Sequence, residues 1–325
     1  MLSEAIKSEP IVSVVLGSFN RLPFLRKTIE SIRNELNDSP HEIIVVDGGS
    51  TDGSIKWLTS QKDVLLILQH NRGEWQGRSI TRKSWGHFMN LGFRSARAAY
   101  ICMLSDDCLL VPGAILKGIR HIETQRQKGV NVGAGAFYWR NWPYEKQYRV
   151  GLTIGTKIFV NHGLYLKGAM EAVGYADESK YIFYHADGDL CLKMWRAGFE
   201  VIECPDSYVE HFDLANKPIK AGNLKTQQQD WEQYKREWVR QEEGMIEPEI
   251  PWIFKKFEDH SNTASKYFWL WTRADTEYLI RRYVFLSPDR LRTIVVLFFT
   301  NPRRFFSLLQ RKVHFLLRNT FTSKG

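Results

Sequence analysis

Features typical of secreted, zinc-binding and membrane-spanning proteins are scarce in this chain. It has 4 cysteines in 325 residues and no C-x-x-C pair, so neither a disulfide framework nor a zinc site is expected. Apolar runs such as residues 294–299 are much shorter than the roughly 20 residues that a membrane-spanning helix needs. Residues 1–10 are polar and charged, unlike a secretory signal. We therefore expect a cytoplasmic protein with reduced thiols and no membrane-spanning helix.

Net charge is absent from most of the chain as well. The formal charge is +9, but residues 278–325 hold 10 Lys and Arg against a single acid, Asp289. The other 277 residues therefore balance 35 basic side chains against 35 acidic ones. A hydrophobic fraction of 43% and a charged fraction of 25% are ordinary for a globular protein. The length allows one catalytic domain and an appendage, and the excess positive charge belongs to the last residues.

Strand and helix patterns alternate through the first two thirds of the chain. This βαβ spacing predicts an α/β fold with a mainly parallel sheet covered on both faces. The segment 131–166, rich in Gly and aromatic residues, is expected to form irregular strands and loops. The expected strands are 11–16, 42–46, 64–68, 100–104 and 200–202, and the expected helices are 23–36, 54–60, 85–98, 112–127 and 187–197.

Carboxylates stand where two of the apolar strands end. Asp47 ends the second strand, and Asp106 and Asp107 end the fourth. Ligands bind at the carboxyl ends of parallel strands, so these acids are expected to share one crevice with the residues after the first strand. Adjacent carboxylates repel each other unless a cation lies between them, and a divalent metal holding a phosphorylated ligand is the commonest solution. Asp47 would then accept a hydrogen bond from a base or ribose, and Phe19 would offer an aromatic face.

Four motifs in this order are similar to those of the family 2 glycosyltransferases, over about residues 11–211. They are VVLGSFNR at 14–21, VVDGGSTDGS at 45–54, NLG at 90–92 and YICMLSDD at 100–107. The resemblance implies a GT-A fold, with a nucleotide-binding half followed by an acceptor-binding half. It also implies inverting transfer of a sugar from a nucleoside diphosphate donor, most simply a UDP-sugar, assisted by Mn²⁺ or Mg²⁺.

The same resemblance assigns roles to individual residues. Asp187, in HADGDLCLK at 185–193, matches the general base of the family, and His211 matches a frequent metal or phosphate ligand. Asp107 is the expected metal ligand beside His211. The expected nucleotide-binding residues are Ser18, Phe19, Asn20, Asp47, Arg82 and Asp106.

Departures from the family pattern leave alternatives open. Ala186 stands where the family has an acid before the base, and Ser105 stands at the first position of its metal motif. These changes allow a non-catalytic member that binds glycans or partner proteins. A nucleotidyltransferase is a third possibility, although the segment after the first strand is a poor phosphate loop. The carboxylates themselves are compatible with simple turns and helix caps. Arg78 and Lys83 compete with Arg82 for the basic role.

We expect a catalytic domain over residues 8–215 and a helical extension over 216–325. Residues 227–243 are strongly helical, and Trp231, Tyr234 and Trp238 favour a packing stripe over a sugar-stacking surface. After residue 288, basic residues interleave with Leu, Ile and Phe, a pattern typical of helices that lie in a membrane interface.

The acceptor would then be a saccharide or a lipid-linked glycan of surface polysaccharide synthesis, reached at the inner face of the membrane. The alternative is that these helices pack on the catalytic domain. Nucleic-acid binding is not expected because no recognised motif accompanies the basic residues. The sugar, the linkage and the oligomeric state stay open.

Overall fold

The computed structural model describes residues 9–141, 145, 147–212, 217–257 and 306. The chain divides into two compact units, Met1–Phe268 and Trp269–Gly325, and the description below concerns the first. The basic helices expected after residue 288 lie outside the described residues, apart from Phe306, which is helical. None of the described helices combines the length and the apolar character needed to cross a bilayer.

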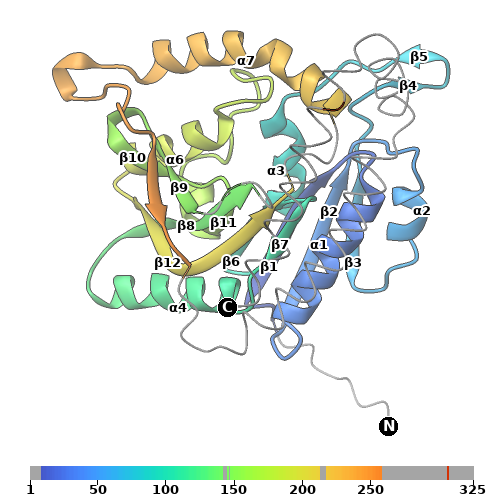
Figure 1. Ribbon diagram of the computed structural model, residues 1–325, viewed down its shortest axis with the longest axis horizontal. Helices are drawn as coiled ribbons and strands as arrows, with labels where there is room; N and C mark the ends of the chain where they lie inside the picture. Colours follow the sequence, from blue (N-terminus) through green and yellow to red (C-terminus); the bar gives the residue numbers. More distant parts are fainter. Residues whose placement is uncertain (1–8, 142–144, 146, 213–216, 258–305, 307–325) are drawn as a thin grey trace. The chain divides into compact units, whose positions relative to one another are not determined.

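The first half is a parallel sheet, and the expected α/β fold is confirmed. Its strands pair in the order β3-β2-β1-β6 (Figure 1). The apolar residues of β1, β2 and β6 are buried on both faces, as in sheets covered by helices on each side, whereas the edge strand β3 is partly exposed. These strands are β1 (Val12–Ser18), β2 (His41–Asp47), β3 (Val64–Leu68) and β6 (Tyr100–Ser105).

Helices cover both faces of this parallel sheet. Alternate residues of β1 and β2 pack with α1 (Leu22–Glu35) and α4 (Ala114–Gln127) in the main core, while α3 (Trp85–Ser95) covers the other face. There Gly92 allows close approach, since a Cβ at this position would lie 2.5 Å from Val15 Cγ1. The short helix α2 (Ser54–Leu58) connects β2 to β3.

The second half extends the sheet with mostly antiparallel strands, in the order β6-β11-β8-β9-β10. The expectation of irregular structure over 131–166 was therefore wrong in part. Nine of the ten residues of β8 are buried, so the strand shows no alternation that could identify it. The strands are β8 (Val132–Asn141), β9 (Tyr148–Thr153), β10 (Lys157–Phe159) and β11 (Gly163–Leu166), with a 3₁₀ turn at Ile154–Thr156.

One long strand links the two halves. β12 (Glu200–His211) runs parallel to β8 and pairs antiparallel with the short strand β7 (Cys108–Leu110). β7 follows directly after Asp106 and Asp107, which we call the Asp pair. The sequence indicated only residues 200–202 as a strand because Pro205 interrupts the pattern, at the point where the register shifts. This pairing brings the carboxyl end of β12 to the acidic end of β6.

Helices α6 (Ala186–Arg196) and α7 (Lys217–Trp238) form a second core with the β9–β10 turn. α7 begins ten residues before the expected helix at 227 and ends at Trp238, followed by a 3₁₀ turn at Gln241–Glu243. Tyr234 and Trp238 are each 1% exposed, so the aromatic stripe is confirmed as packing. α7 lies within the first compact unit, which extends past residue 215.

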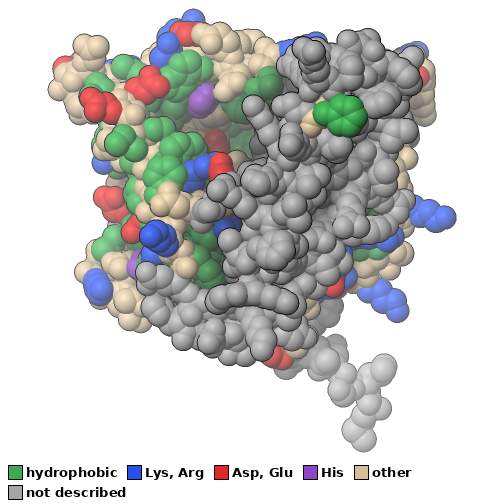
Figure 2. Space-filling model, viewed as in Figure 1, with side chains coloured by type: hydrophobic (Ala, Val, Ile, Leu, Met, Phe, Trp, Pro, Cys, Tyr) green, Lys and Arg blue, Asp and Glu red, His purple; other side chains and the backbone are tan. Residues whose placement is uncertain are grey.

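The remaining elements lie at the margins of this unit. They are the hairpin β4 (Glu74–Trp75) and β5 (Arg78–Ser79), helix α5 (Lys167–Ala172) and strand β13 (Trp252–Lys255), which pairs with β9. Exposed apolar side chains occur near β13, namely Ile246, Ile250 and Phe254. Figure 2 shows hydrophobic side chains gathered over this part of the molecule.

Candidate active site

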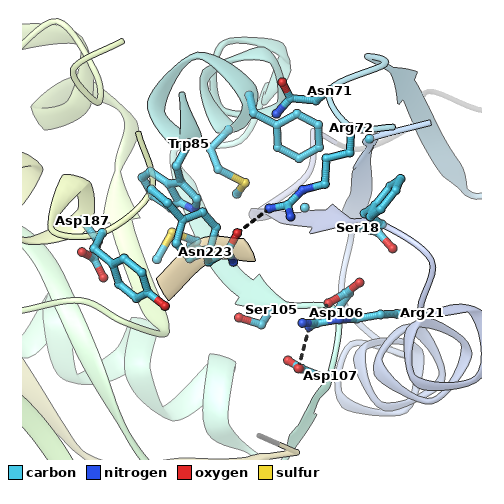
Figure 3. Close-up of a pocket in the computed structure, with 18 of the residues that line it drawn as sticks. Ser18, Arg21, Asn71, Arg72, Trp85, Ser105, Asp106, Asp107, Asp187 and Asn223 are labelled. Carbon is cyan, nitrogen blue, oxygen red and sulfur yellow. Dashed lines mark hydrogen bonds and ion pairs between the residues drawn. The ribbon is translucent and has the colours of Figure 1, made fainter. Parts of the chain in front are cut away.

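A cavity of about 380 Å³ opens at the carboxyl ends of the parallel strands (Figure 3). It is bounded by the ends of β1, β6 and β12, by α3, and by the segments before α6 and in α7. Seven of the nine predicted site residues line it: Ser18, Phe19, Arg82, Asp106, Asp107, Asp187 and His211. Asn20 and Asp47 do not line the cavity.

Arg21 neutralises the Asp pair at the end of β6. Its Nη1 donates to Asp106 Oδ1 at 2.9 Å and to Asp107 Oδ2 at 2.6 Å. Burial raises the pKa of Asp106 to about 6, although Arg21 opposes this shift. Burial acts on Asp107 in the same direction, but Arg21 and His211 together hold the pKa of Asp107 below its ordinary value. Asp107 is therefore the carboxylate that stays ionised in this pair.

His211 faces Asp107 across the end of the cavity. Its Nδ1 lies 2.9 Å from Asn141 Oδ1, so Nδ1 is the nitrogen that donates to this oxygen and Nε2 is the nitrogen turned toward Asp107. Nε2 is 3.4 Å from Asp107 Oδ1. That oxygen is buried and accepts no well-aligned hydrogen bond among the described residues. In the neutral ring Nε2 is an acceptor, and two acceptors held this close suit a divalent cation between them, so Asp107 and His211 fit the metal that the family implies.

Asp47 organises the turn after β2. Its Oδ1 accepts from the backbone N–H groups of Gly49 (2.9 Å) and Ser50 (2.7 Å), and its Oδ2 accepts from Ser50 Oγ at 2.7 Å. Asn20, with a positive φ of 52°, joins the same turn by accepting from Thr51 N at 2.7 Å. Asp47 and Asn20 therefore hold the turn that lies next to the cavity, although neither lines the cavity itself. Direct contact of either residue with a nucleotide stays a prediction.

Two arginines form a cationic wall opposite the Asp pair. Arg72 and Arg82 both donate to Asn223 Oδ1 on α7, at 2.8 and 2.9 Å. Burial lowers the pKa of Arg72 to about 10, and the neighbouring charges of Arg82 and Arg21 add to this shift. Two guanidinium groups that share one neutral carbonyl leave donors available for an anion. The predicted Arg82 thus lies in the site with Arg72, whereas Arg78 lies on the exposed hairpin β5.

Asp187 lies at the end of the cavity away from the Asp pair, in the first turn of α6 (Figure 3). The side chain is partly buried, and its Oδ1 accepts from Gly188 N at 2.9 Å. Burial raises the pKa of Asp187 to about 6. No ion pair to this carboxylate occurs in the described part of the chain. Asp187 therefore has the environment of a proton acceptor working near neutral pH.

Asp189, two residues further along α6, has a different environment. It is fully buried, and its Oδ1 accepts from Tyr181 Oη at 3.0 Å and from Trp238 Nε1 at 2.8 Å. The bond from Trp238 ties α6 to α7, and the bond from Tyr181 ties α6 to the segment before it, so Asp189 supports the fold beside the candidate base. Ala186, which departs from the family pattern, is buried in the same core.

Several residues of the site had no signal in the sequence. Arg72 and Asn223 are 151 residues apart and belong to no motif, so only folding brings them together. Arg21 was part of the first motif, but its contact with the Asp pair depends on how α1 begins beside the end of β6. These residues come together at the carboxyl edge of the sheet, because strands that are distant in sequence end there side by side.

Comparisons with known proteins agree with this architecture. A mannosyltransferase from Pyrobaculum calidifontis, solved with GDP-Man and Mn²⁺, is similar over 98% of this chain and 88% of its own, with 15% identity and a TM-score of 0.50. Residues 1–349 of Staphylococcus aureus TarS, solved with UDP-GlcNAc, are similar over 72% of this chain and 69% of theirs, with 11% identity and a TM-score of 0.50. The fold is that of the GT-A glycosyltransferases.

The family follows from the sequence match. Residues 13–177, about half of the chain, match the model of glycosyl transferase family 2. This chain therefore belongs to glycosyl transferase family 2, as its motifs predicted.

Matches to curated relatives are more limited in extent. The uncharacterized glycosyltransferase YwdF of Bacillus subtilis is 31% identical over 115 residues, which are 35% of this chain and 38% of YwdF. The uncharacterized protein y4gI of Sinorhizobium fredii is 22% identical over 247 residues, which are 65% of this chain and 25% of y4gI. The matches thus span between a quarter and two fifths of the length of these relatives.

Proposed function

We propose that this chain is a metal-dependent, inverting glycosyltransferase that moves a sugar from a nucleoside diphosphate donor, most simply a UDP-sugar, to a glycan or lipid-linked acceptor. One observation supports this most strongly: Asp107, which is paired with Arg21, and Asp187, which has a raised pKa and no ion pair among the described residues, line the same cavity. Sugar transfer needs both environments at once, since the leaving diphosphate is anionic and the attacking hydroxyl must lose a proton.

The Asp107 end of the cavity suits the leaving group. Asp107 and His211 would hold Mn²⁺ or Mg²⁺, and such an ion supplies charge neutralisation to the departing diphosphate. Arg72 and Arg82 present further positive charge from the opposite wall. Phe19, over which the guanidinium of Arg72 lies at 5.7 Å from the ring centroid, offers an apolar surface to the donor.

The Asp187 end suits the acceptor. In one displacement, the acceptor hydroxyl oxygen forms a bond to the anomeric carbon while the bond from that carbon to the diphosphate oxygen breaks. The hydroxyl proton passes to a carboxylate oxygen of Asp187. Attack from the face opposite the leaving group inverts the anomeric configuration, and no covalent intermediate is required. With a pKa of about 6, Asp187 is ionised at pH 7 yet basic enough to accept this proton.

The biological setting is proposed from the sequence. A role in surface polysaccharide synthesis, at the inner face of a membrane in the cytoplasm, would bring the basic residues after 288 to anionic lipid headgroups. Flotation with anionic liposomes tests this directly, comparing the full chain with a chain ending at Leu286. Equal partitioning of the two would contradict a membrane role for these residues.

A donor screen tests the transfer reaction. UDP- and GDP-sugars are incubated with the full chain, with and without Mn²⁺, and release of the nucleoside diphosphate is measured with a mixed saccharide acceptor. We expect one donor to be consumed only with metal, and proton NMR of the product to show the inverted anomer. A retained configuration, or consumption that ignores metal across the whole screen, would contradict the proposal.

A non-catalytic, glycan- or partner-binding member of the family is the second candidate, favoured by Ser105 and Ala186 in place of acids. Calorimetric titration with UDP separates the two. An intact donor site binds UDP more tightly when Mn²⁺ is present, whereas a site that has lost its donor function shows no such dependence.

A further inference from the structure

A second group of potential metal ligands lies directly behind the Asp pair. Cys108 begins β7, His211 ends β12 opposite it, and His162 comes from the loop before β11. One ligand atom from each of these side chains lies within 4.8 Å of the other two. The Sγ of Cys108 is 3.8 Å from His162 Nδ1 and 3.7 Å from His162 Nε2. Segments far apart in sequence thus bring two imidazole nitrogens and one thiol sulfur close together.

This convergence occurs in the interior, where unused polar groups are costly. Cys108 is 0% exposed and His162 is 1% exposed. In the described structure, the His162 ring has no polar side-chain contact beyond the weak one to the thiol, apart from its ring contact with His211. A buried imidazole usually has a strong hydrogen-bond partner or a metal. A metal ion coordinated by one ring nitrogen would give His162 the strong partner that the described side chains do not supply.

The surroundings hold the donors in place. Asn141 accepts from Nδ1 of His211 and so directs Nε2 inward, the arrangement by which a neighbouring carbonyl orients a metal-binding imidazole. The ring of Trp139 packs edge-on against both histidines, with centroid distances of 6.0 Å to His162 and 5.7 Å to His211. The donors are therefore rigid and shielded from water on this side.

We infer that Cys108, His162 and His211 form a zinc site. Thiolate and imidazole donors select Zn²⁺ over the harder Mg²⁺ and Mn²⁺. Three protein ligands with an open fourth position are typical of zinc sites that exchange a ligand. Asp107 Oδ1 lies 3.4 Å from His211 Nε2, next to one of the three ligands. On binding, the Cys108 thiol releases its proton to solvent and its sulfur coordinates the ion.

This site goes beyond sugar transfer and does not depend on it. It shares His211 with the ion proposed for the donor, so the imidazole of His211 serves one of the two ions at a time. The absence of a zinc spacing in the sequence is explained by the fold, because residues 108, 162 and 211 are brought together by β7, β11 and β12.

Cobalt titration of the full chain tests the inference without an activity assay. Co²⁺ takes zinc positions and reports a bound thiolate by a sulfur-to-metal charge-transfer band in the near ultraviolet. After removal of metals with a chelator, we expect one equivalent of Co²⁺ to produce this band and Zn²⁺ to abolish it. Binding of Co²⁺ without the band, or no binding, would overturn the inference.

Variants identify the ligands. Cys108→Ser should remove the band, and His162→Asn should weaken Zn²⁺ binding by at least about 10–100-fold, the loss typical of even an indirect ligand partner. The matched control is Cys204→Ser, a buried cysteine outside the cluster, which should keep the band. A band that persists in Cys108→Ser or disappears in Cys204→Ser would contradict the assignment.

Asp107→Asn separates this inference from the proposed function. It should retain the charge-transfer band while losing metal-dependent donor binding. Circular dichroism of each variant checks that the fold is intact, and the titration of the unmodified chain decides the question even where a variant does not fold.

Discussion

Asp107 and Asp187 line the same cavity, yet their surroundings are opposite. Asp107 meets Arg21 and His211, which hold its pKa low against burial. Asp187 is partly buried with backbone contacts and no ion pair in the described structure, and burial raises its pKa to about 6. Carboxylates whose environments push their pKa values apart take different chemical roles. Because of this difference, we assign Asp107 the role of a carboxylate that stays ionised and Asp187 the role of a carboxylate that accepts and releases a proton.

The largest expected effect is on the proton acceptor. Asp187→Asn keeps the shape of the side chain but cannot accept the proton, so we expect the transfer rate to fall by about 10²–10⁴-fold. The measurement is transfer of the sugar to acceptor under saturating donor. Asp206→Asn, on the exposed part of β12, is the control and should transfer normally. Full turnover by Asp187→Asn would remove the base assignment.

The next effect concerns the charged end. Asp107→Asn removes a metal ligand, and the loss of several kcal/mol of charge stabilisation should slow transfer by about 100-fold or more. The response to Mn²⁺ should also weaken in a titration of the transfer rate against metal. An unchanged metal dependence in this variant would show that the ion binds elsewhere.

The pH dependence of transfer sharpens the comparison. Since Asp187 must be ionised, the rate should fall roughly tenfold per pH unit as pH drops below about 6. The group whose pKa is held low, Asp107, stays ionised over this range and contributes no inflection. The measurement is the rate at saturating donor between pH 5 and 8, with a rate independent of pH as the contradicting result.

The stability of Asp187→Asn should change in the opposite direction from its activity. The folded pKa of Asp187 lies above its unfolded value, so its contribution to stability is present at low pH and is lost as pH rises through about 6. At pH 7 the variant should therefore be more stable by about 1–3 kcal/mol, and below about pH 4 the two proteins should be equal. Urea unfolding at both pH values measures this, and a destabilised variant at pH 7 would contradict the burial argument.

The smallest expected effect is on the cationic wall. Arg72→Met should raise the KM for donor by about tenfold, because one charge-assisted hydrogen bond is worth about 1.5–3 kcal/mol and Arg82 remains. The measurement is KM with the acceptor saturating. Arg78→Met, on the exposed hairpin, is the matched control, and equal KM values for the two variants would exclude Arg72 from donor binding.

The sequence predicted the parallel half of the molecule better than the rest. Val64–Leu68 was predicted to the residue, and most other elements of that half agree within two or three residues because turn residues punctuate apolar strands. The strand β8 was not predicted because its residues are buried on both faces, which removes the alternation of apolar and polar residues on which strand prediction depends. The strand β12 was predicted only over residues 200–202 because Pro205 interrupts its pattern.

The candidate site follows the same division. An acid at a strand end carries a local signal, which identified Asp107, whereas Asp187 was identified by the match of residues 185–193 to a family motif. Contacts between distant segments carry none: Arg72 with Asn223, and Cys108 with His162, become neighbours only through the sheet order. Asp47 ends β2 as predicted, but both of its carboxylate oxygens accept hydrogen bonds from residues of the turn that follows.

Calorimetric titration of a donor sugar, with Mn²⁺ present, into Asp187→Asn and Asp107→Asn side by side tests the central assignment most directly. The two-role account predicts that Asp187→Asn binds donor like the unmodified chain, while Asp107→Asn binds it much more weakly. Equal donor affinities for the two variants, or the reverse order, would contradict the division of roles between these carboxylates.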